Sequence, residues 1–247
     1  MNFRFSILIL STAVTLLSLA STTQAWNDTG HEIVALLAFQ RLDPATQKKV
    51  LAILADHPHA GEYLKSRSPD GNIDGERIAM NAATWSDWVR NHHKKGFHKG
   101  TWHYVNKPYI IEGDVAKRKE IQDAFDAVKN HGDILTIIPK AIGAIKAPAD
   151  TLEARQTRAV MLCWLFHLVG DVHQPLHAVA LCTGDMPEGD HGGNSIWVAK
   201  KTGQRPQKLH GVWDHMLGDH KDVRGIAREI SMSAAVSDSL ATKLDPA

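Results

Sequence analysis

Apolar residues recur every three or four positions along most of the chain, and this spacing predicts a mainly helical protein. Asp43 followed by Pro44 is typical of an N-cap and a first helical turn, and Thr29 is expected to cap the first helix. Clefts between such helices are places where side chains from several elements converge. The predicted helices cover residues 29–39, 43–55, 76–91, 115–130, 134–145, 152–172 and 223–240.

Residues 195–210 depart from the helical pattern. Apolar and polar positions alternate there, and Thr202-Gly203 has the composition of a tight turn, so this segment is expected to form one short β-hairpin. No linker, repeat or low-complexity tract interrupts residues 26–247. We therefore expect a single helical domain with its own core and one short hairpin.

The first 25 residues have the pattern of a secretory signal peptide. Arg4 precedes an apolar run over residues 6–20, which is shorter than the roughly 20 residues of a membrane span, and Ala25 is a suitable cleavage position. Cleavage would make Trp26 the new N-terminus. The mature protein is then expected to be secreted or periplasmic and free of the membrane; an uncleaved anchor is the alternative.

The charge balance excludes general basicity as a means of binding polyanions. The chain holds 28 Lys and Arg against 27 Asp and Glu, so a nucleic-acid partner would have to be attracted by local charge and bound metal. Cys163 and Cys182 are the two cysteines, and they could form a disulfide or stay reduced. Because they lack the spacing of a cysteine zinc site, the 15 histidines are the obvious nitrogen donors.

Residues 167–177, His-Leu-Val-Gly-Asp-Val-His-Gln-Pro-Leu-His, are the segment most suggestive of a metal site. His167 and Asp171 lie one helical turn apart and can reach one ion. Pro175 disfavours continuation of the helix, which brings His177 from a new direction, while His173 points elsewhere. Burial of so many polar groups among apolar residues is costly without pairing or coordination. Histidines of an ordinary core or surface helix are the alternative.

Two further segments offer groups suited to a metal ion or a phosphate. The α-amine and carbonyl oxygen of a new N-terminal Trp26 could chelate an ion together with His31. Arg90 lies about one helical turn from Asp87, and a guanidinium beside a metal-bound carboxylate suits a phosphate oxygen. An ordinary surface ion pair is the alternative for Asp87 and Arg90.

Two other segments hold possible metal ligands. One places a histidine beside an aromatic ring and an amide, and the other holds a second histidine and aspartate one helical turn apart. His103 is followed by Tyr104 and Asn106, whose ring and amide could stack on a base and hydrogen-bond to it, although aromatic residues are often simply part of a core. His210 and Asp214 repeat the four-residue spacing of the first pair, with solvated helix residues as the alternative.

Residues 91–99, Asn-His-His-Lys-Lys-Gly-Phe-His-Lys, form a basic segment. The expected role is that of a solvated surface, and steering of an anionic substrate is the alternative. No site is assigned to this segment from the sequence.

Six short blocks, in their order along the chain, resemble the zinc-dependent single-strand nucleases of the S1/P1, or type I nuclease, family. Each block alone is weak, but six separated blocks in one order are highly specific. Two cysteines and a single glycosylation sequon at Asn27 favour a bacterial, secreted member. The blocks are Trp26 with His31, Thr84-Trp85-Ser86-Asp87 with Arg90, Trp102–Tyr104, His167–His177, Gly189–Asn194 and Leu209–Asp214.

The resemblance implies a phospholipase C/single-strand nuclease type fold with three zinc ions in a cleft. Asp87 and Arg90 would be catalytic, and Tyr104, Asn106 and Asn194 would contact the substrate. Some relatives have aspartate in place of Asn106, which leaves the base preference open. The implied ligands are Asp87, His103, His167 and Asp171 for the first ion, Trp26, His31 and the shared Asp171 for the second, and His177, His210 and Asp214 for the third.

The activity implied by the resemblance is hydrolysis of phosphate esters. The expected substrates are single-stranded DNA and RNA, cleaved to 5′-phosphorylated nucleotides, and 3′-nucleotides, which lose their 3′-phosphate. The nearest alternative is a phospholipase C-like phosphodiesterase, which would share the fold and the zinc arrangement. A non-catalytic exported zinc-binding protein is the alternative from another class, because it would need the ligands but neither Arg90 nor Tyr104.

Overall fold

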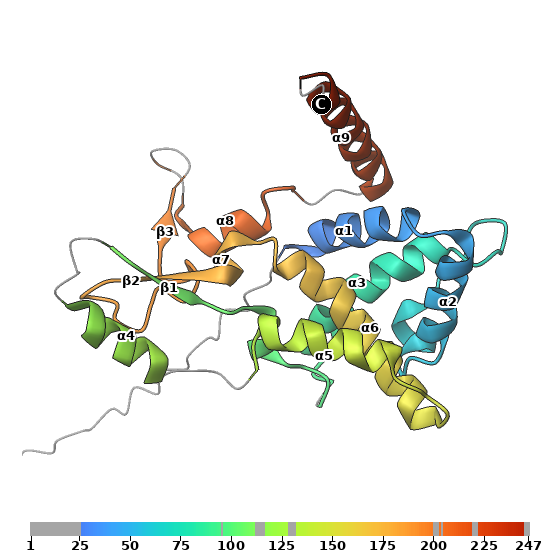
Figure 1. Ribbon diagram of the computed structural model, residues 1–247, viewed down its shortest axis with the longest axis horizontal. Coiled ribbons are helices and arrows are strands. Elements are labelled where there is room, and N and C mark those ends of the chain that lie inside the picture. Colours follow the sequence, from blue (N-terminus) through green and yellow to red (C-terminus); the bar gives the residue numbers. More distant parts are fainter. Residues whose placement is uncertain are drawn as a thin grey trace, which may run out of the picture.

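The computed structural model describes residues 26–94, 96–111, 117–127, 132–199, 203, 205–218 and 222–244, with side chains omitted for 127 and 235–244. The predicted signal peptide lies outside these residues. The described chain is mainly helical, as expected (Figure 1). Its α-helices are α1 (Asp28–Gln40), α2 (Pro44–Ala55), α3 (Gly75–Asn91), α4 (Arg118–Ala127), α5 (Ile134–Lys146), α6 (Leu152–Asp171), α7 (Pro175–Ala178), α8 (Leu209–Asp214) and α9 (Val223–Leu244).

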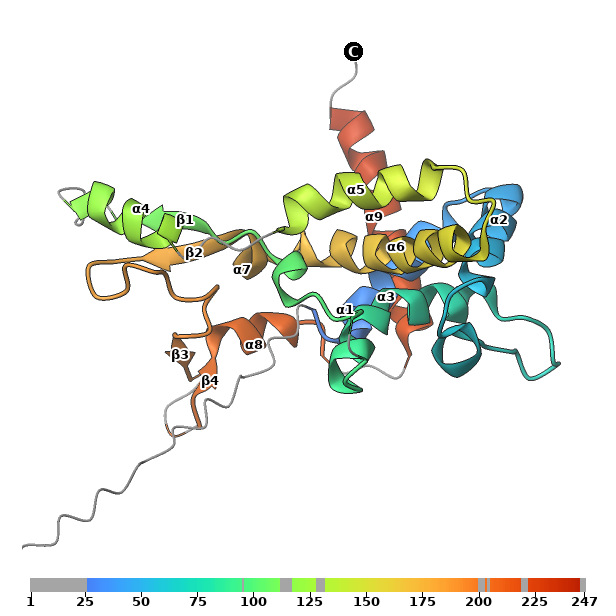
Figure 2. The ribbon, with the colours of Figure 1, turned by 90° about the horizontal axis from the view of Figure 1, so that it is seen from below.

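Helix α6 is the centre of the helical body. It packs against α1, α2, α3 and α5, and Figure 2 shows it between α5 on one side and α3 on the other. Trp85 of α3 and Trp164 of α6 are both almost fully buried, with ring centroids 6.3 Å apart in an edge-to-face arrangement. Burial of large aromatic side chains supplies much of the driving force that holds these helices together. This packing fixes the C-terminal half of α6, where His167 and Asp171 lie.

The ends of the helices follow their capping residues. Asp43 caps α2, and its Oδ1 accepts hydrogen bonds from the backbone N–H groups of Ala45 and Thr46, each at 3.0 Å, as predicted. The predicted Thr29 cap of α1 is wrong, because Asn27 takes that position and its side chain accepts a bond from Gly30 N. Thr29 consequently lies inside the helix. The helix expected over 115–130 is present as α4, and part of the expected range falls outside the described residues.

Short helical and extended segments connect the main helices. A π-helical turn covers Ala60–Leu64 and a 3₁₀ turn covers Gly100–His103. Strand β1 (Lys107–Ile110) pairs in parallel with β2 (Val179–Cys182), and β3 (Trp197–Val198) pairs antiparallel with β4 (Gln207–Lys208). The second pair confirms the expected hairpin, with Gly203 at a positive φ of 85°.

The strands, together with α4, α7 and α8, form a smaller part beside the helical body (Figure 1). Helix α9 packs on α1 through its first turns and then extends away from the body. Cys163 and Cys182 are both buried free thiols, so no disulfide joins them. No helix within the described ranges is both long and apolar enough to cross a bilayer.

Candidate metal centre

Five buried histidine and aspartate side chains meet at the C-terminal half of α6. His167 and Asp171 lie on α6 itself, Asp87 comes from α3, His31 from α1, and His103 from the 3₁₀ turn. The Asp171 carboxylate is 2.9 Å from His103 Nδ1, 3.2 Å from His167 Nε2 and 3.4 Å from His31 Nε2. None of the five is more than 5% exposed. The helical spacing of His167 and Asp171 therefore does place both on one face, as predicted.

The close approach of α1 to α6 depends on Gly170. A Cβ at this position would lie 2.6 Å from Nδ1 of His31, so no larger residue fits without displacement of the imidazole. His31 instead lies against the backbone of α6 and stacks on His167, with ring centroids 3.9 Å apart and planes 15° apart. The glycine in the His-x-x-Gly-Asp block is thus explained by the space that the imidazole needs.

A second group consists of His177, His210 and Asp214, which come from α7 and α8. His177 Nε2 is 3.3 Å from His210 Nε2, and His210 Nε2 is 3.6 Å from Asp214 Oδ2. The chain reaches this geometry because Gln174 is extended and begins α7 directly before Pro175, which confirms the predicted bend. All three side chains are buried.

Backbone carbonyls orient three of these imidazoles. A carbonyl oxygen only accepts hydrogen bonds, so each facing Nδ1 is a protonated nitrogen, and Nε2 is the nitrogen left to bind a metal ion. Nε2 is also the atom directed at the neighbouring ligand atoms, in the way that metal-ligating histidines are usually held. The pairs are His167 with the oxygen of Ala83 (2.7 Å), His177 with that of His103 (2.6 Å) and His210 with that of Gly192 (2.7 Å).

Gln174 holds the carboxylate of the second group. Its side chain is fully buried, its Nε2 donates to Asp214 Oδ1 at 2.9 Å, and its Oε1 accepts from Leu176 N at 2.6 Å. One residue thus both caps α7 and orients Asp214. The sequence analysis did not assign Gln174 a role; its position directly before a proline was the available signal.

The protonation states of the buried groups reflect the absence of bulk water. Burial raises the pKa of Asp214 to about 8 and, together with His167, lowers that of His31 to about 3. Burial also lowers the pKa of His167, but the charges of Asp171 and Asp87 outweigh it and raise the value to about 9. Without a cation, protons therefore reside on Asp214 and His167 at neutral pH. A divalent ion bound by these atoms would displace those protons.

Several of the donor atoms fit a metal ion because they are buried and make no hydrogen bond. Most buried polar atoms in proteins have a hydrogen bond, so a cluster of buried atoms without one needs an explanation. A cation supplies the missing partner, and a set of imidazoles and carboxylates without thiolate suits zinc. The atoms that make no hydrogen bond are both ring nitrogens of His31, both carboxylate oxygens of Asp87, Nε2 of His103 and Oδ1 of Asp171.

Three sets of ligand atoms, each set lying within 4.8 Å, occur among the described residues. The first two share His167, so they are parts of one continuous cluster, and geometry alone does not divide their members between two ions. The sets are His31, Asp87 and His167; His103, His167 and Asp171; and His177, His210 and Asp214.

Trp26 lies beside the second group. The backbone N–H of Asn27 donates to the carbonyl oxygen of Asp214 at 3.0 Å, and the Asn27 side chain donates to Gly218 O at 2.8 Å. A Cβ at Gly30 would lie 2.6 Å from Trp26 Cβ, so this glycine lets the tryptophan fold back against α1. The start of the expected mature chain is therefore held next to Asp214, and its role as a ligand stays a prediction.

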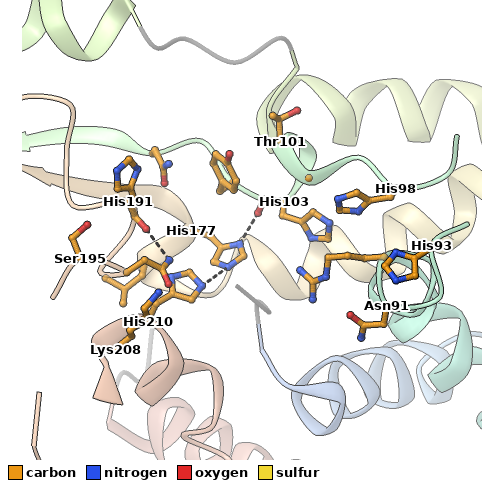
Figure 3. Close-up of a pocket in the computed structure, with 16 residues that line it drawn as sticks. Asn91, His93, His98, Thr101, His103, His177, His191, Ser195, Lys208 and His210 are labelled. Carbon is orange, nitrogen blue, oxygen red and sulfur yellow. Dashed lines mark hydrogen bonds between the residues drawn. The ribbon is translucent and has the colours of Figure 1, made fainter. Parts of the chain in front are cut away.

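An open cleft of about 1090 Å³ lies over the histidines (Figure 3). Arg90, Tyr104, Asn106 and Asn194 all line it, so the residues expected to contact substrate share one cavity. Nη2 of Arg90 is 3.0 Å from Asp87 Oδ1, which ties the guanidinium to the metal-site carboxylate. None of the 16 described lining residues is acidic. Cleft residues that the sequence analysis left unassigned include Asn91, His93, His98, Thr101, His191, Ser195 and Lys208.

The fold and the site define a mainly helical protein with a buried cluster of histidine and aspartate side chains that could hold metal ions, beneath an open cleft without acidic lining residues. The chain belongs to the S1/P1 nuclease family, whose sequence pattern matches residues 26–245.

Relatives with assigned names include plant and fungal nucleases. The chain is 27% identical to Endonuclease 4 of Arabidopsis thaliana over 78% of its own length and 55% of the relative. It is 26% identical to Nuclease S1 of Aspergillus oryzae, over 80% of its own length and 56% of the relative. It is also 26% identical to Endonuclease 2 of Arabidopsis thaliana, over 81% of its own length and 59% of the relative. The chain thus spans little more than half the length of these relatives.

Proposed function

We propose that this protein is a zinc-dependent hydrolase of phosphate esters that cleaves single-stranded DNA and RNA to 5′-phosphorylated nucleotides. Removal of the 3′-phosphate from 3′-nucleotides is a second activity of the same site. The observation that carries the proposal is the cluster of buried His and Asp atoms without hydrogen bonds beneath a cleft with no acidic lining. Family membership and relatives named as nucleases support the reaction class.

Three zinc ions would be held by the residues that the sequence predicts. When bound, zinc supplies Lewis-acid chemistry, which activates water near neutral pH and offsets charge on phosphate oxygens. One of the three sets of closely spaced ligand atoms, His177 with His210 and Asp214, matches a proposed group, and the other two sets bring the remaining His and Asp ligands into one cluster. The proposed ligands are Asp87, His103, His167 and Asp171; Trp26, His31 and Asp171; and His177, His210 and Asp214.

Arg90 positions and neutralises the reacting phosphate. Its ion pair with Asp87 fixes the guanidinium at the cleft wall, only 14% exposed, where a planar cation can donate two hydrogen bonds to non-bridging phosphate oxygens. Charge that grows on those oxygens during bond cleavage is thereby stabilised. Asp87 contributes by holding both a metal ion and Arg90.

Tyr104, Asn106 and Asn194 would hold the base. The Tyr104 ring offers a stacking surface in the cleft, and the amides of Asn106 and Asn194 can hydrogen-bond to a base edge. Nδ2 of Asn194 already donates to His191 O at 2.9 Å, which leaves its Oδ1 to accept from the substrate. In a duplex the faces and edges of the bases are covered by stacking and pairing, which is the physical reason for a preference for single strands.

The protein would act after export, in the periplasm or outside the cell. Removal of residues 1–25 as a signal peptide would create the α-amine of Trp26, which with His31 and Asp171 would complete the second zinc site. A chain with an extra residue before Trp26 should then lose both zinc and activity.

The test follows cleavage of heat-denatured and native DNA by the mature protein before chelation, after chelation, and after zinc is restored. We expect digestion of the denatured strand that zinc restores, with the duplex spared. Arg90→Ala should keep the zinc content and lose turnover by about 10²–10³-fold. Release of phosphocholine from lipid with DNA left intact would indicate the phospholipase C-like alternative, and a zinc-loaded protein inert towards all phosphoesters would indicate the non-catalytic one.

A further inference from the structure

The cleft continues past the metal ligands, away from the proposed base-binding end. Figure 3 shows His191, Ser195 and Lys208 at one end and His93 and His98 at the other, with the metal-ligating His103, His177 and His210 between them. Pockets for drug-sized ligands are typically about 300–1000 Å³, so a cleft of about 1090 Å³ has room beyond one nucleotide. A nucleic-acid strand that places a base at the first end and its phosphate over the ligands would therefore continue towards the imidazoles.

His93 occupies a backbone position that normally favours glycine. Helix α3 ends with bonds from Lys94 N to Val89 O (3.0 Å) and from His93 N to Arg90 O (3.3 Å), the pattern of a Schellman motif in which His93 is the left-handed residue. Its φ is 51°, and glycine is the usual residue there because a side chain is disfavoured in this region. A histidine held in this conformation, with its ring lining a cleft, points to a use for that ring.

The three non-glycine residues with positive φ in the described chain are His93, Asn106 and His191, and all three line the cleft. Backbone strain is thus concentrated at this cavity, on both of its walls. His93 and His98 both have exposed side chains and lie near Arg90, whose ion-pair partner Asp87 is buried outside the cleft lining. An anion is the ligand that such a group of imidazole N–H donors, a guanidinium and the Asn91 amide would attract.

We propose that His93 and His98, with Asn91, form a subsite for a second backbone phosphate of the substrate, beyond the phosphate that is cleaved. The proposal rests on the proposed nuclease function and adds to it a reason to prefer a polynucleotide over a mononucleotide or dinucleotide. An imidazole N–H donates to a phosphate oxygen of the neighbouring linkage, so the contact exists only when the substrate carries that linkage. The basic segment over residues 91–99 is thereby given a binding role.

The test compares a substrate that has a single phosphodiester linkage with one that has several. The variants are His93→Gly and His98→Ala, and the zinc-loaded protein is assayed with the dinucleotide TpT and with a longer oligothymidylate. Binding is measured separately, by fluorescence anisotropy with a labelled phosphorothioate oligothymidylate that is cleaved slowly. His92→Ala is the matched control, because the His92 ring stacks on Trp88 at 4.8 Å and its Nδ1 faces Trp88 O, outside the cleft lining.

We expect each variant to weaken oligothymidylate binding about tenfold, the loss for one hydrogen bond to a charged group, and to raise KM for that substrate. The kcat/KM for TpT should stay unchanged, as should the binding and the kinetics of His92→Ala with both substrates. Since glycine suits the left-handed position, the thermal midpoint of His93→Gly should be equal to or above that of the parent protein. If the His93 ring had only a structural role, the thermal midpoint of His93→Gly should be lower than that of the parent protein.

Equal losses on TpT and the oligomer, or no loss on either, would overturn the subsite. A loss of the same size in His92→Ala would overturn it as well. The parent protein could cleave no nucleic acid while the two variants still bind the labelled oligothymidylate more weakly than the parent does. The nuclease proposal would then fail and the phosphate subsite would stand.

Discussion

At the scale of single residues, Gly170 decides whether His31 of α1 can approach the ligands on α6. Replacement by alanine would place a Cβ 2.6 Å from His31 Nδ1, in a region where His31 and Asp171 are fully buried. Gly170→Ala should therefore displace His31, destabilise the fold by about 1–3 kcal/mol, and reduce the bound zinc. The measurements are the free energy of unfolding in urea and the zinc content after dialysis.

Gly143→Ala in α5 is the matched control for this prediction. Nothing lies within 4 Å of a Cβ at Gly143, so alanine should stabilise that helix by up to about 1 kcal/mol and leave the zinc content unchanged. If Gly170→Ala behaved in the same way as Gly143→Ala, the account of why α6 has a glycine beside His31 would be wrong.

His57 should make the protein sensitive to acid independently of the metal centre. Burial, and then the neighbouring His59, lower the pKa of His57 to about 3, against about 6.5 in an unfolded chain. Between these values the unfolded chain binds a proton that the folded one does not, so stability falls as the pH drops below about 6.5, by up to about 1.4 kcal/mol per pH unit.

His57→Asn tests this linkage. The Asn side chain can still accept the hydrogen bond that His57 Nδ1 receives from His59 N at 2.9 Å, but it does not titrate. Urea unfolding of the metal-free protein at several pH values should show a shallower loss of stability between pH 6.5 and 4 in the variant. Identical slopes for the two proteins would show that His57 does not carry the effect.

At the scale of elements, the short helix α7 supports the proposed third zinc site through its cap. Gln174→Ala removes the hydrogen bond to Asp214 and the cap of the helix that presents His177. Loss of a residue that orients metal ligands typically weakens metal affinity about 10–100-fold, and we expect a loss of that size at one of the three ions. Competition with a zinc chelator measures the affinity.

Gln47→Ala is the control for the cap, because its amide donates to Phe39 O at 3.0 Å in a part of α1 and α2 remote from the ligands. It should cost some stability and no zinc. A zinc affinity lowered equally by both variants would mean that general destabilisation, rather than the orientation of Asp214, explains the loss.

Elements set by local sequence were the predictable ones. The helical period and the Asp43 cap define α2, and regular apolar spacing defines α3 and α6 within one or two residues. The parallel pairing of Lys107 with Val179 could not be predicted, because it joins residues far apart whose strands are only four residues long. Likewise, Asn27 rather than Thr29 caps α1 because Asn27 is held by Asp214 and Gly218, at the other end of the chain.

The residues of the candidate metal centre show the same difference between local features, which could be predicted, and long-range contacts, which could not. Pairs one helical turn apart, such as His167 with Asp171 and His210 with Asp214, could be predicted from spacing alone and do lie together. The contact of His31 with Asp171 depends on the packing of α1 on α6, which spacing does not encode. The resemblance to a family supplied that association, and the division of the ligands among three ions still rests on it.

At the scale of the whole molecule, a nearly neutral chain lines one cleft with Arg90, Lys208 and several imidazoles and with no acidic side chain, while Asp87, Asp171 and Asp214 are buried. Because metal binds the folded centre and not the unfolded chain, zinc at a hundredfold excess over its Kd should add about 2.7 kcal/mol per site. For a domain of this size that is about 5–10 °C of thermal midpoint per site. Chelation should lower the midpoint and zinc restore it, whereas a midpoint indifferent to both would mean that the centre is not a metal site.

We propose that this histidine–aspartate centre binds three zinc ions and uses them to cleave single-stranded nucleic acid. The most direct measurement is a titration of the metal-free mature protein with zinc while cleavage of denatured DNA is followed. We expect cleavage to rise to a plateau at three equivalents of zinc per chain. A plateau at a single equivalent, or no cleavage at any zinc concentration, would contradict it.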